Sequence, residues 1–425
     1  MNEFKIRDPI HGFVEFNEWE KQIIGHPVFQ RLRRIRQLAL TDMVFPGGLH
    51  TRFEHSLGVM HLATKMYESI LNNDYNRTIL KDNYGFNEAG FVRNKQIVRL
   101  AALLHDIGHA PLSHASEDLM QIDESTGKPL KHEDYTVCII ENCLKDVIEN
   151  HQINKNNYNI KAEEVTGLIE GDPEKAGQVV FWKVIISGQL DADRSDYLLR
   201  DSLHTGVKYG VYDLDRLLSM LAIGEDLENK GELLLGIKEG GWHVAESVIL
   251  ARYQMFSQVY FHKTKRSFEL IYNQAMKDIF GKIPSKDNLE EFLKWDDYHV
   301  IEKFKDHPEN YWCKSLIQRK HLYMLHQTTE VPELNEVEDF IKIQKHLNEE
   351  SVWVVEDDVE KVWYESKRDG ESTNEIMIIG KNGICKPLSQ HSRLVHNMGE
   401  LKQMRLYVKQ EEKNKALKIK EEALK

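Results

Sequence analysis

Residues 103–118 read LLHDIGHAPLSHASED, and this stretch says more about the fold than any other part of the 425-residue chain. It closes the apolar run KQIVRLAALLHDI at 95–107, whose composition predicts a buried helix. His105 and Asp106 are adjacent where that helix is expected to end, and Gly108 follows. A pair in this position can turn an imidazole nitrogen and a carboxylate oxygen toward one point. Such donors suit iron, manganese, zinc or magnesium better than thiophilic metals.

Histidine and aspartate also cluster on either side of this stretch. Seven of the twenty histidines lie between positions 50 and 132: His50, His55, His61, His105, His109, His114 and His132. Four aspartates fall within DADRSDYLLRD at 191–201: Asp191, Asp193, Asp196 and Asp201. An isolated His-Asp pair is usually an ordinary surface or core feature, and four aspartates can form a solvated helix face. Their joint occurrence favours a metal site built from imidazoles and carboxylates.

The periodicity of apolar residues predicts a mainly α protein. Helical spacing recurs in 18–39, 56–72, 187–203 and 244–280, with an interruption near Pro27. Strand signals are confined to 232–240 and to 351–390, where Asn382–Gly383 indicates a hairpin turn. The final stretch, 401–425, is expected to be a charged helix. We predict a helical catalytic core over 1–285 and a C-terminal helical region, 286–425, with a small β element.

Composition limits the class of protein. Hydrophobic residues at 41% and charged residues at 29% are typical of a globular chain. The net charge of -12 argues against broad contact with duplex DNA or an anionic membrane. No stretch approaches the roughly 18 apolar residues of a membrane span. The chain has four cysteines, Cys138, Cys143, Cys313 and Cys385, and they form no CxxC pair. We interpret them as free thiols in a reducing compartment and therefore expect the protein in the cytoplasm.

The order of the clusters resembles the H…HD…D signature of the HD superfamily, whose core is a helical HD-domain fold. More narrowly, several segments are similar to deoxynucleoside triphosphate triphosphohydrolases, both the vertebrate enzymes that join a sterile-alpha-motif domain to an HD domain and their bacterial relatives. These segments are RDPIHGFVEF at 7–16, FQRLRRIRQL running on to VFPGGLHTRFEHSLGV within 29–59, LLHDIGHAPLSH at 103–114, KHED at 131–134 and DADRSDYLLRD at 191–201. The match spans roughly residues 4–275.

The resemblance implies a role for each matching residue. Implied metal ligands are His55, His105, Asp106 and Asp193. His109, His114 and His132 would line the α-phosphate, with Glu117 and Glu133 orienting the imidazoles. His114 is the first choice for the acid that protonates the leaving 5′-oxygen, and His109 the second. The bound divalent metal would lower the pKa of water and neutralise charge on phosphorus, and the donor set does not distinguish Mn, Mg, Fe, Zn or Ni.

Substrate contacts follow from the same resemblance. Residues at positions that meet the sugar or the phosphates are Gln37, Leu38, Arg52, Arg194, Tyr197 and Asp201. A later segment would serve the triphosphate with His262, Lys263, Lys265 and Arg266. The implied reaction is metal-dependent hydrolysis of deoxynucleoside triphosphates (dNTPs) to deoxynucleoside and tripolyphosphate, by attack of water at the α-phosphorus. A homodimer or homotetramer is implied as well.

One departure bears on regulation. Vertebrate enzymes read guanine at an activator site with an acidic residue, and Gly25 stands at the matching position, while Gln30 and Arg33 do match that site. Guanine-triggered activation is therefore not predicted, although the resemblance still allows a nucleotide activator at a subunit interface.

Two alternatives remain open. The chain could act on another nucleotide phosphoester, because the base pocket is not readable from the sequence. It could instead be a nucleotide sensor or nucleic-acid-binding protein, a reading motivated by the arginines within 31–36. The full set of ligand and acid–base residues favours an active hydrolase.

Overall fold

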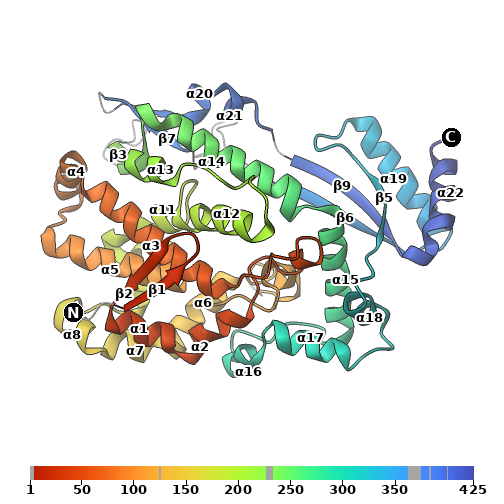
Figure 1. Ribbon diagram of the computed structural model, residues 1–425, viewed down its shortest axis with the longest axis horizontal. Coiled ribbons are helices and arrows are strands. Elements are labelled where there is room, and N and C mark those ends of the chain that lie inside the picture. Colours follow the sequence, from red (N-terminus) through yellow and green to blue (C-terminus); the bar gives the residue numbers. More distant parts are fainter. Residues whose placement is uncertain (1–3, 124–125, 226–232, 362–374, 382–383, 400) are drawn as a thin grey trace.

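Helices form the body of the molecule, which confirms the predicted fold class (Figure 1). The computed structural model describes residues 4–123, 126–225, 233–361, 375–381, 384–399 and 401–425. The helices of the first half are α1 Glu18–Gly25, α2 Pro27–Gln30, α3 Arg52–Leu71, α4 Asp74–Tyr84, α5 Glu88–Leu104, α6 His132–Ile139, α7 Lys145–Asn150, α8 Gln152–Asn157, α9 Ala162–Glu170, α10 Pro173–Ala176, α11 Lys183–Ile186 and α12 Ala192–Thr205. Those of the second half are α13 Leu214–Met220, α14 Trp242–Met255, α15 Lys263–Ile279, α16 Leu289–Lys294, α17 Asp297–Lys305, α18 Tyr311–Ile317, α19 Leu334–Glu349, α20 Leu388–His391, α21 Arg393–Asn397 and α22 Lys413–Ala423.

Three small sheets lie around this helical body. Their strands are β1 Phe4–Asp8, β2 Gly12–Phe16, β3 Leu221–Glu225, β4 Leu233–Lys238, β5 Tyr323–Gln327, β6 Val354–Lys361, β7 Met377–Ile379, β8 Cys385–Pro387 and β9 Leu401–Val408. β1 and β2 form an antiparallel hairpin in which Phe4 pairs with Phe16. A four-stranded sheet has the order β3-β4-β7-β8, with β4 and β7 parallel. The third sheet has the order β5-β9-β6 and lies with α19 and α22 at the C-terminal end of the molecule (Figure 1).

The long helices α3 and α5 pack together at the centre of the core, and α12 lies against α3. Gly58 allows this second contact, because a Cβ at that position would overlap the carboxylate of Asp196 and the guanidinium of Arg200 on α12. Fully buried aromatic side chains such as Trp182 and Phe268 fill the space between the helices. The close approach of α3 and α12 brings residues about 140 positions apart into one site.

Several boundaries differ from those that periodicity predicts. The expected helix over 401–425 is wrong in its first part, because 401–408 is the strand β9. The segment 18–39 ends its helices by Arg34, and 244–280 is interrupted between α14 and α15. The hairpin β1–β2 was not anticipated. The strand signal at 232–240 corresponds to β4, whereas the turn at Asn382–Gly383 lies outside the described residues.

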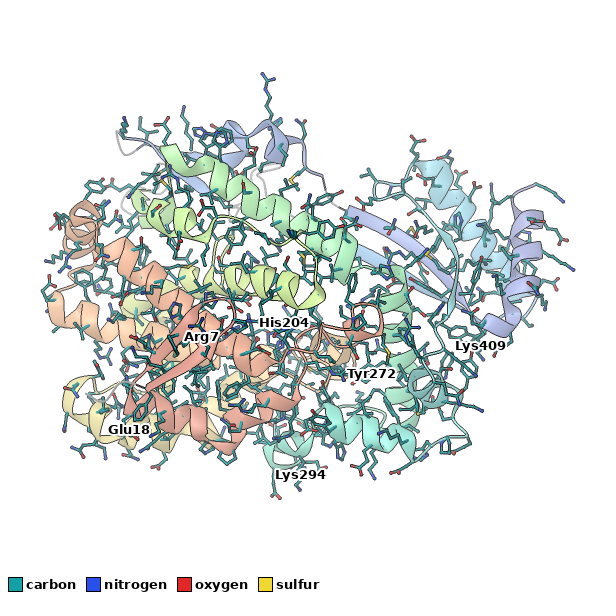
Figure 2. The ribbon with its side chains drawn as sticks, viewed as in Figure 1. Arg7, Glu18, His204, Tyr272, Lys294 and Lys409 are labelled. Atoms are coloured by element: carbon teal, nitrogen blue, oxygen red, sulfur yellow. The ribbon has the colours of Figure 1, made fainter. Side chains whose placement is uncertain are left out.

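The C-terminal sheet is fixed to the helical body through aromatic and charged contacts. Lys409, labelled in Figure 2, places its Nζ 4.8 Å from the ring centroid of Tyr311 and 5.3 Å from that of Trp312. Such cation–π contacts contribute about 0.5–2 kcal/mol, depending on solvent exposure. None of the helices described is long and apolar enough to cross a membrane.

Candidate active site

His55, His105, Asp106 and Asp193 come together, although they lie on three different helices or helix ends. His55 is in the first turns of α3, His105 caps the C-terminus of α5, and Asp193 is in the first turn of α12. The Nε2 atom of His55 lies 3.0 Å from Asp193 Oδ1 and 3.5 Å from Asp106 Oδ2. His105 Nε2 lies 3.4 Å from Asp106 Oδ1 and 3.8 Å from Asp193 Oδ1. Two nitrogen donors and two carboxylates thus face one point.

Both imidazoles present the nitrogen that a metal would need. His105 Nδ1 lies 2.8 Å from the carbonyl oxygen of Ala102, and His55 Nδ1 lies 2.8 Å from Asp196 Oδ2. A proton on each Nδ1 leaves the Nε2 lone pair free. Both Nε2 atoms are buried without a hydrogen-bond partner among the described residues. Orphaned nitrogens beside carboxylates fit a divalent cation with mixed nitrogen and oxygen ligands.

The electrostatics of the cluster also fit a cation. Burial alone would lower the pKa of His55, but the carboxylates of Asp193 and Asp196 beside it raise that pKa to about 10, and a bound metal would take the place of the proton on Nε2. The pKa of Asp193 is lowered, because burial is outweighed by the contacts with His105 and His55. The carboxylates therefore create a strongly negative potential at the buried centre. A divalent metal would neutralise it.

A second group of side chains adjoins this cluster. His109 is fully buried, and its ring stacks on His132 with centroids 3.8 Å apart, while His114 meets it edge-on at 4.9 Å. Glu117 Oε1 lies 2.9 Å from His114 Nδ1 and 2.8 Å from His132 Nδ1. Glu133 Oε2 is 3.3 Å from the same nitrogen of His132. One carboxylate therefore orients two imidazoles.

His109 and His132 differ in their affinity for a proton. Burial, together with the charges of Arg52 and His132, lowers the pKa of His109 well below its ordinary value. Burial acts in the same direction on His132, but Glu117 and Glu133 outweigh it and raise the pKa. A neutral imidazole thus lies against one that holds its proton, an arrangement suited to acid–base and phosphate-binding chemistry.

Both groups open into one cavity of about 450 Å³. It is lined by Gln37, Arg52, His105, Asp106, His109, His114, Lys131, His132, Glu133, Asp134, Ile169, Glu170, Lys183, Ile186, Ser187, Asp193 and Tyr197. Arg52 donates to Asp106 over 2.5 Å and to Ser113 over 3.0 Å. Three cations, four imidazoles and five carboxylates therefore line one cavity.

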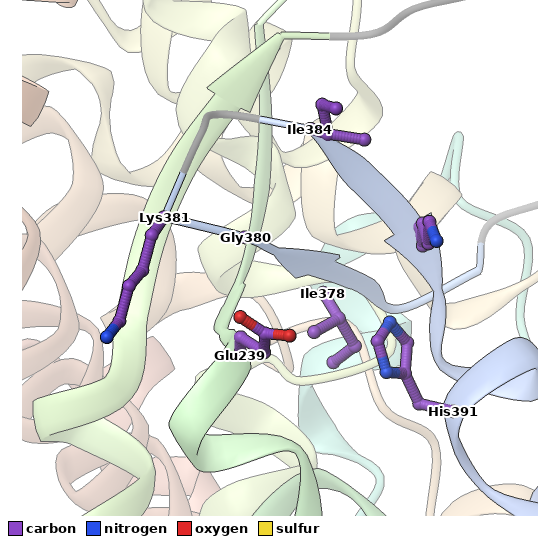
Figure 3. A pocket seen from close by; sticks show the side chains of 7 residues that line it. Glu239, Ile378, Gly380, Lys381, Ile384 and His391 are labelled. Carbon is purple, nitrogen blue, oxygen red and sulfur yellow. The ribbon is translucent and has the colours of Figure 1, made fainter.

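A second cavity, of about 370 Å³, lies between the β7–β8 hairpin and the start of α14 (Figure 3). Its side chains include Glu239, Lys381 and His391, and the figure shows them spread around the opening. They supply a single carboxylate and a single imidazole. The chemistry of the first cavity makes it the candidate active site.

Each aspartate of the 191–201 run has a separate position. Asp191 caps α12, because its carboxylate accepts from the backbone N–H of Arg194 over 2.7 Å. Asp193 faces His55, and Asp196 accepts from the opposite side of the same imidazole. Asp201 is buried behind the cavity, 2.7 Å from His50 Nε2 and 2.6 Å from the hydroxyl of Tyr260. The run is therefore not a solvated face.

The predicted substrate-binding residues divide into two sets. Gln37, Arg52 and Tyr197 line the cavity. The others do not line it: Leu38, Arg194, Asp201, His262, Lys263, Lys265 and Arg266.

The later basic segment instead has internal contacts. Lys265 pairs with Glu269, and Arg266 pairs with Asp357 over 2.5 Å and with Glu269 over 2.8 Å. Tyr407 donates to the carbonyl oxygen of Lys263. His262 caps α15. The cations that line the cavity besides Arg52 are Lys131 and Lys183. Sequence reasoning assigned a role to neither, although Lys131 begins the KHED segment at 131–134.

Each arginine within 31–36 has a partner inside the chain, although Arg33 and Arg34 remain exposed. Arg31 is 1% exposed and donates to the carbonyl oxygen of Trp295. Arg34 pairs with Asp296 over 2.5 Å and Arg36 with Asp42 over 2.8 Å. The guanidinium carbon of Arg33 lies 3.5 Å from the ring centroid of Phe53. These contacts give each arginine a partner within the fold, so the cluster does not require a nucleic acid to explain it.

Comparison with known proteins places this chain in a family. An HD domain model matches residues 52–182, and an HD associated region model matches residues 212–425. The chain belongs to the HD-domain phosphohydrolase family. It is 31% identical to the uncharacterized protein YwfO of Bacillus subtilis, over 94% of this chain and 90% of that protein.

Two further relatives extend this comparison. A hypothetical protein from Aquifex aeolicus has a similar crystal structure, with a TM-score of 0.77 and 30% identity, covering 98% of this chain and 100% of the other. A Dictyostelium discoideum protein named as a deoxynucleoside triphosphate triphosphohydrolase SAMHD1 homolog is 30% identical over 67% of this chain. The chain spans about half (51%) of that relative's length.

Proposed function

We propose that this protein hydrolyses dNTPs to deoxynucleoside and tripolyphosphate. The observation that carries the proposal is the convergence of His55, His105, Asp106 and Asp193 at a cavity that three further histidines line. Kinship with a relative named for this activity supports the choice of substrate. The cavity volume, about 450 Å³, accommodates a small-molecule substrate of this size.

The reaction would divide its tasks among residues of this chain. A metal held by the His-Asp cluster would supply Lewis-acid stabilisation of charge on phosphorus and lower the pKa of water. Arg52 and the protonated His132 would bind α-phosphate oxygens. The water oxygen bonds to the α-phosphorus and its proton passes to solvent, while the bond from phosphorus to the 5′-oxygen breaks. His114 gives a proton to the leaving 5′-oxygen and regains one from solvent. Glu117 holds His114 and His132 in position.

The test is turnover of each of the four dNTPs with Mn²⁺ or Mg²⁺, alone and in pairs, with products separated by ion-exchange chromatography. We expect deoxynucleoside and tripolyphosphate in equal amounts. Removal of metal with a chelator should stop the reaction, and His105→Ala, Asp106→Ala or Asp193→Ala should reduce it to the buffer background. Any of these variants with wild-type turnover in metal-free buffer would exclude the assigned centre. Deoxynucleoside monophosphate and pyrophosphate as products would exclude cleavage of the bond between the α-phosphorus and the 5′-oxygen.

We also propose that the active form is a homodimer or homotetramer in the cytoplasm, in keeping with the four free cysteines. Light scattering combined with activity across a gel-filtration peak tests the assembly. A stable, fully active monomer would contradict it. Activity that appears only in nucleotide mixtures would support an activator site.

A further inference from the structure

The segment RDPIHGF, which carries no assigned role so far, forms the β1–β2 hairpin and reaches the back of the candidate metal centre. Within it, His11 is almost completely buried, with a side-chain exposure of 3%. Its Nε2 lies 2.6 Å from Asp196 Oδ1. Asp196 Oδ2 is the atom that meets Nδ1 of the metal-facing His55. His11 of the hairpin and the predicted metal ligand His55 therefore contact the same carboxylate, that of Asp196.

Asp196 is held on every side. Besides its contacts with the two imidazoles, its carboxylate accepts hydrogen bonds from Nε and Nη2 of Arg200, each over 2.8 Å. A carboxylate offers about four acceptor positions, so this one is saturated. Its own exposure and that of Arg200 are 0%. Rotation of Asp196 would leave a buried donor without an acceptor, which is unfavourable.

The hairpin also holds Arg200. Asp8 Oδ2 accepts from Nη1 of Arg200 over 2.9 Å, while its Oδ1 accepts the backbone N–H groups of Ile10 and His11 over 2.8 and 2.9 Å. The tight turn of the hairpin thus fixes Asp8, Asp8 fixes Arg200, and Arg200 fixes Asp196. This closed set of contacts links residues 8–11 to residues 196–200.

We propose that His11, with Asp8, acts as a positioning group for the metal ligand His55 through Asp196, so that the N-terminal hairpin sets the affinity of the centre for its metal. This inference rests on the metal site of the proposed function but not on the identity of the substrate. Carboxylates behind metal-binding histidines fix the tautomer and the ring orientation, and their loss typically weakens metal affinity 10–100-fold. Here the carboxylate itself needs an anchor from the hairpin.

The chain offers a matched control. The ring of His61 on α3 stacks against that of His11 with centroids 5.4 Å apart. In the described part of the chain, the side chains that donate to Asp196 are those of His11, His55 and Arg200, and His61 is not among them. His61→Gln changes the packing around His11 and leaves the bond from His11 to Asp196 in place. His11→Gln keeps a side-chain N–H that can donate to the same oxygen, whereas His11→Ala removes it.

The experiment measures Mn²⁺ affinity of the full chain without nucleotide, by electron paramagnetic resonance of the free ion. His11→Ala should weaken Mn²⁺ binding roughly 10-fold or more, and Asp196→Asn up to about 100-fold. His11→Gln should recover part of the loss, and His61→Gln should bind as the wild type does. Asp8→Asn gives an independent readout if His11→Ala does not fold, and should also weaken binding.

A purely structural role predicts a different pattern. It would lower the melting temperature equally with and without Mn²⁺, whereas a positioning role reduces the rise in melting temperature that Mn²⁺ produces. Wild-type affinity in folded His11→Ala, or equal losses in His61→Gln and His11→Ala, would overturn the proposal. A wild-type protein that binds Mn²⁺ but hydrolyses no dNTP would contradict the proposed function and leave this inference standing.

Discussion

His109 and His132 stack at 3.8 Å, yet their surroundings move their pKa values in opposite directions. His109 lies in the deeper, drier position beside Arg52, whereas His132 lies beside two glutamates. His114 differs from both, because 63% of its side chain is exposed at the cavity while Glu117 orients its ring. Three chemically identical side chains therefore have three different environments.

The first prediction at the residue scale concerns His114 as the proposed general acid. His114→Ala should lower kcat about 10²–10⁴-fold, the usual contribution of a general acid. Because His114 is exposed, the melting temperature should change little. The control is His346→Ala, which removes a solvent-facing imidazole on α19 and should keep full activity. An unchanged kcat in His114→Ala would transfer the acid role to His109 or His132.

The second concerns pH and stability. Burial, with the nearby charge of His11, lowers the pKa of His61 from 6.5 to about 4. Between these values the unfolded chain binds a proton at this imidazole and the folded chain does not, so stability falls as pH drops. His61→Gln should therefore lose less melting temperature than the wild type between about pH 7 and about pH 4. Parallel melting curves across that range would contradict the assignment.

At the scale of elements, the site depends on how closely α6 approaches the turn after α5. Gly108 lies in that turn, and a Cβ there would overlap the carbonyl oxygen of His132 and the backbone nitrogen of Thr136. The Gly108 N–H donates to the Thr136 hydroxyl over 3.0 Å, which in turn donates to the carbonyl oxygen of His105. The position of His132 relative to Asp106 is thus set by a contact between two backbones.

Gly108→Ala should displace α6 and with it His132. Overpacking of this kind costs about 1–3 kcal/mol of stability, and we expect a loss of kcat of at least about 100-fold, because small misplacements of catalytic groups are costly. Thermal unfolding and steady-state kinetics measure the two effects. Gly240→Ala, where a Cβ meets nothing within 4 Å, is the matched control and should be neutral. Full activity of Gly108→Ala would show that the spacing is not critical.

At the scale of the whole molecule, α15 joins the helical body to the C-terminal sheet. Arg266 on α15 forms ion pairs with Asp357 on β6 and with Glu269. Asp357 is 2% exposed, so its charge is compensated only by such partners. The basic segment that motif reasoning assigned to the triphosphate therefore contributes here to the junction between two parts of the chain.

Asp357→Asn should lower the free energy of unfolding by about 3 kcal/mol, the low end of the cost of removing one partner of a buried ion pair, because Glu269 still accompanies Arg266. KM for dNTPs should remain unchanged, since this pair does not line the cavity. Denaturant unfolding and initial-rate kinetics provide the two measurements. A raised KM with unchanged stability would instead support the predicted role of Arg266 in binding the triphosphate.

The sequence by itself determined the helical class and the family, and it predicted the four residues that the structure gathers into the His-Asp cluster, because these depend on local periodicity and on residue types at long, ungapped motifs. It could not show that 401–408 is a strand. Gln403 and Arg405 are buried there, and their polar character disguises the alternation that marks a strand. Arg405 donates to the carbonyl oxygen of Phe261, about 140 residues away, so only the tertiary structure makes burial of its charge tolerable.

The roles of charged residues divide in the same way. Motif spacing brought attention to Asp193 and Asp196 together, but only the packing of α12 on α3 places one before His55 and the other behind it. Likewise, whether a lysine or arginine faces the cavity or a buried carboxylate depends on partners far along the chain, as Lys183 and Arg266 illustrate. The energy between two charged groups depends on their separation in space, and for residues far apart in the sequence that separation is set by the tertiary structure.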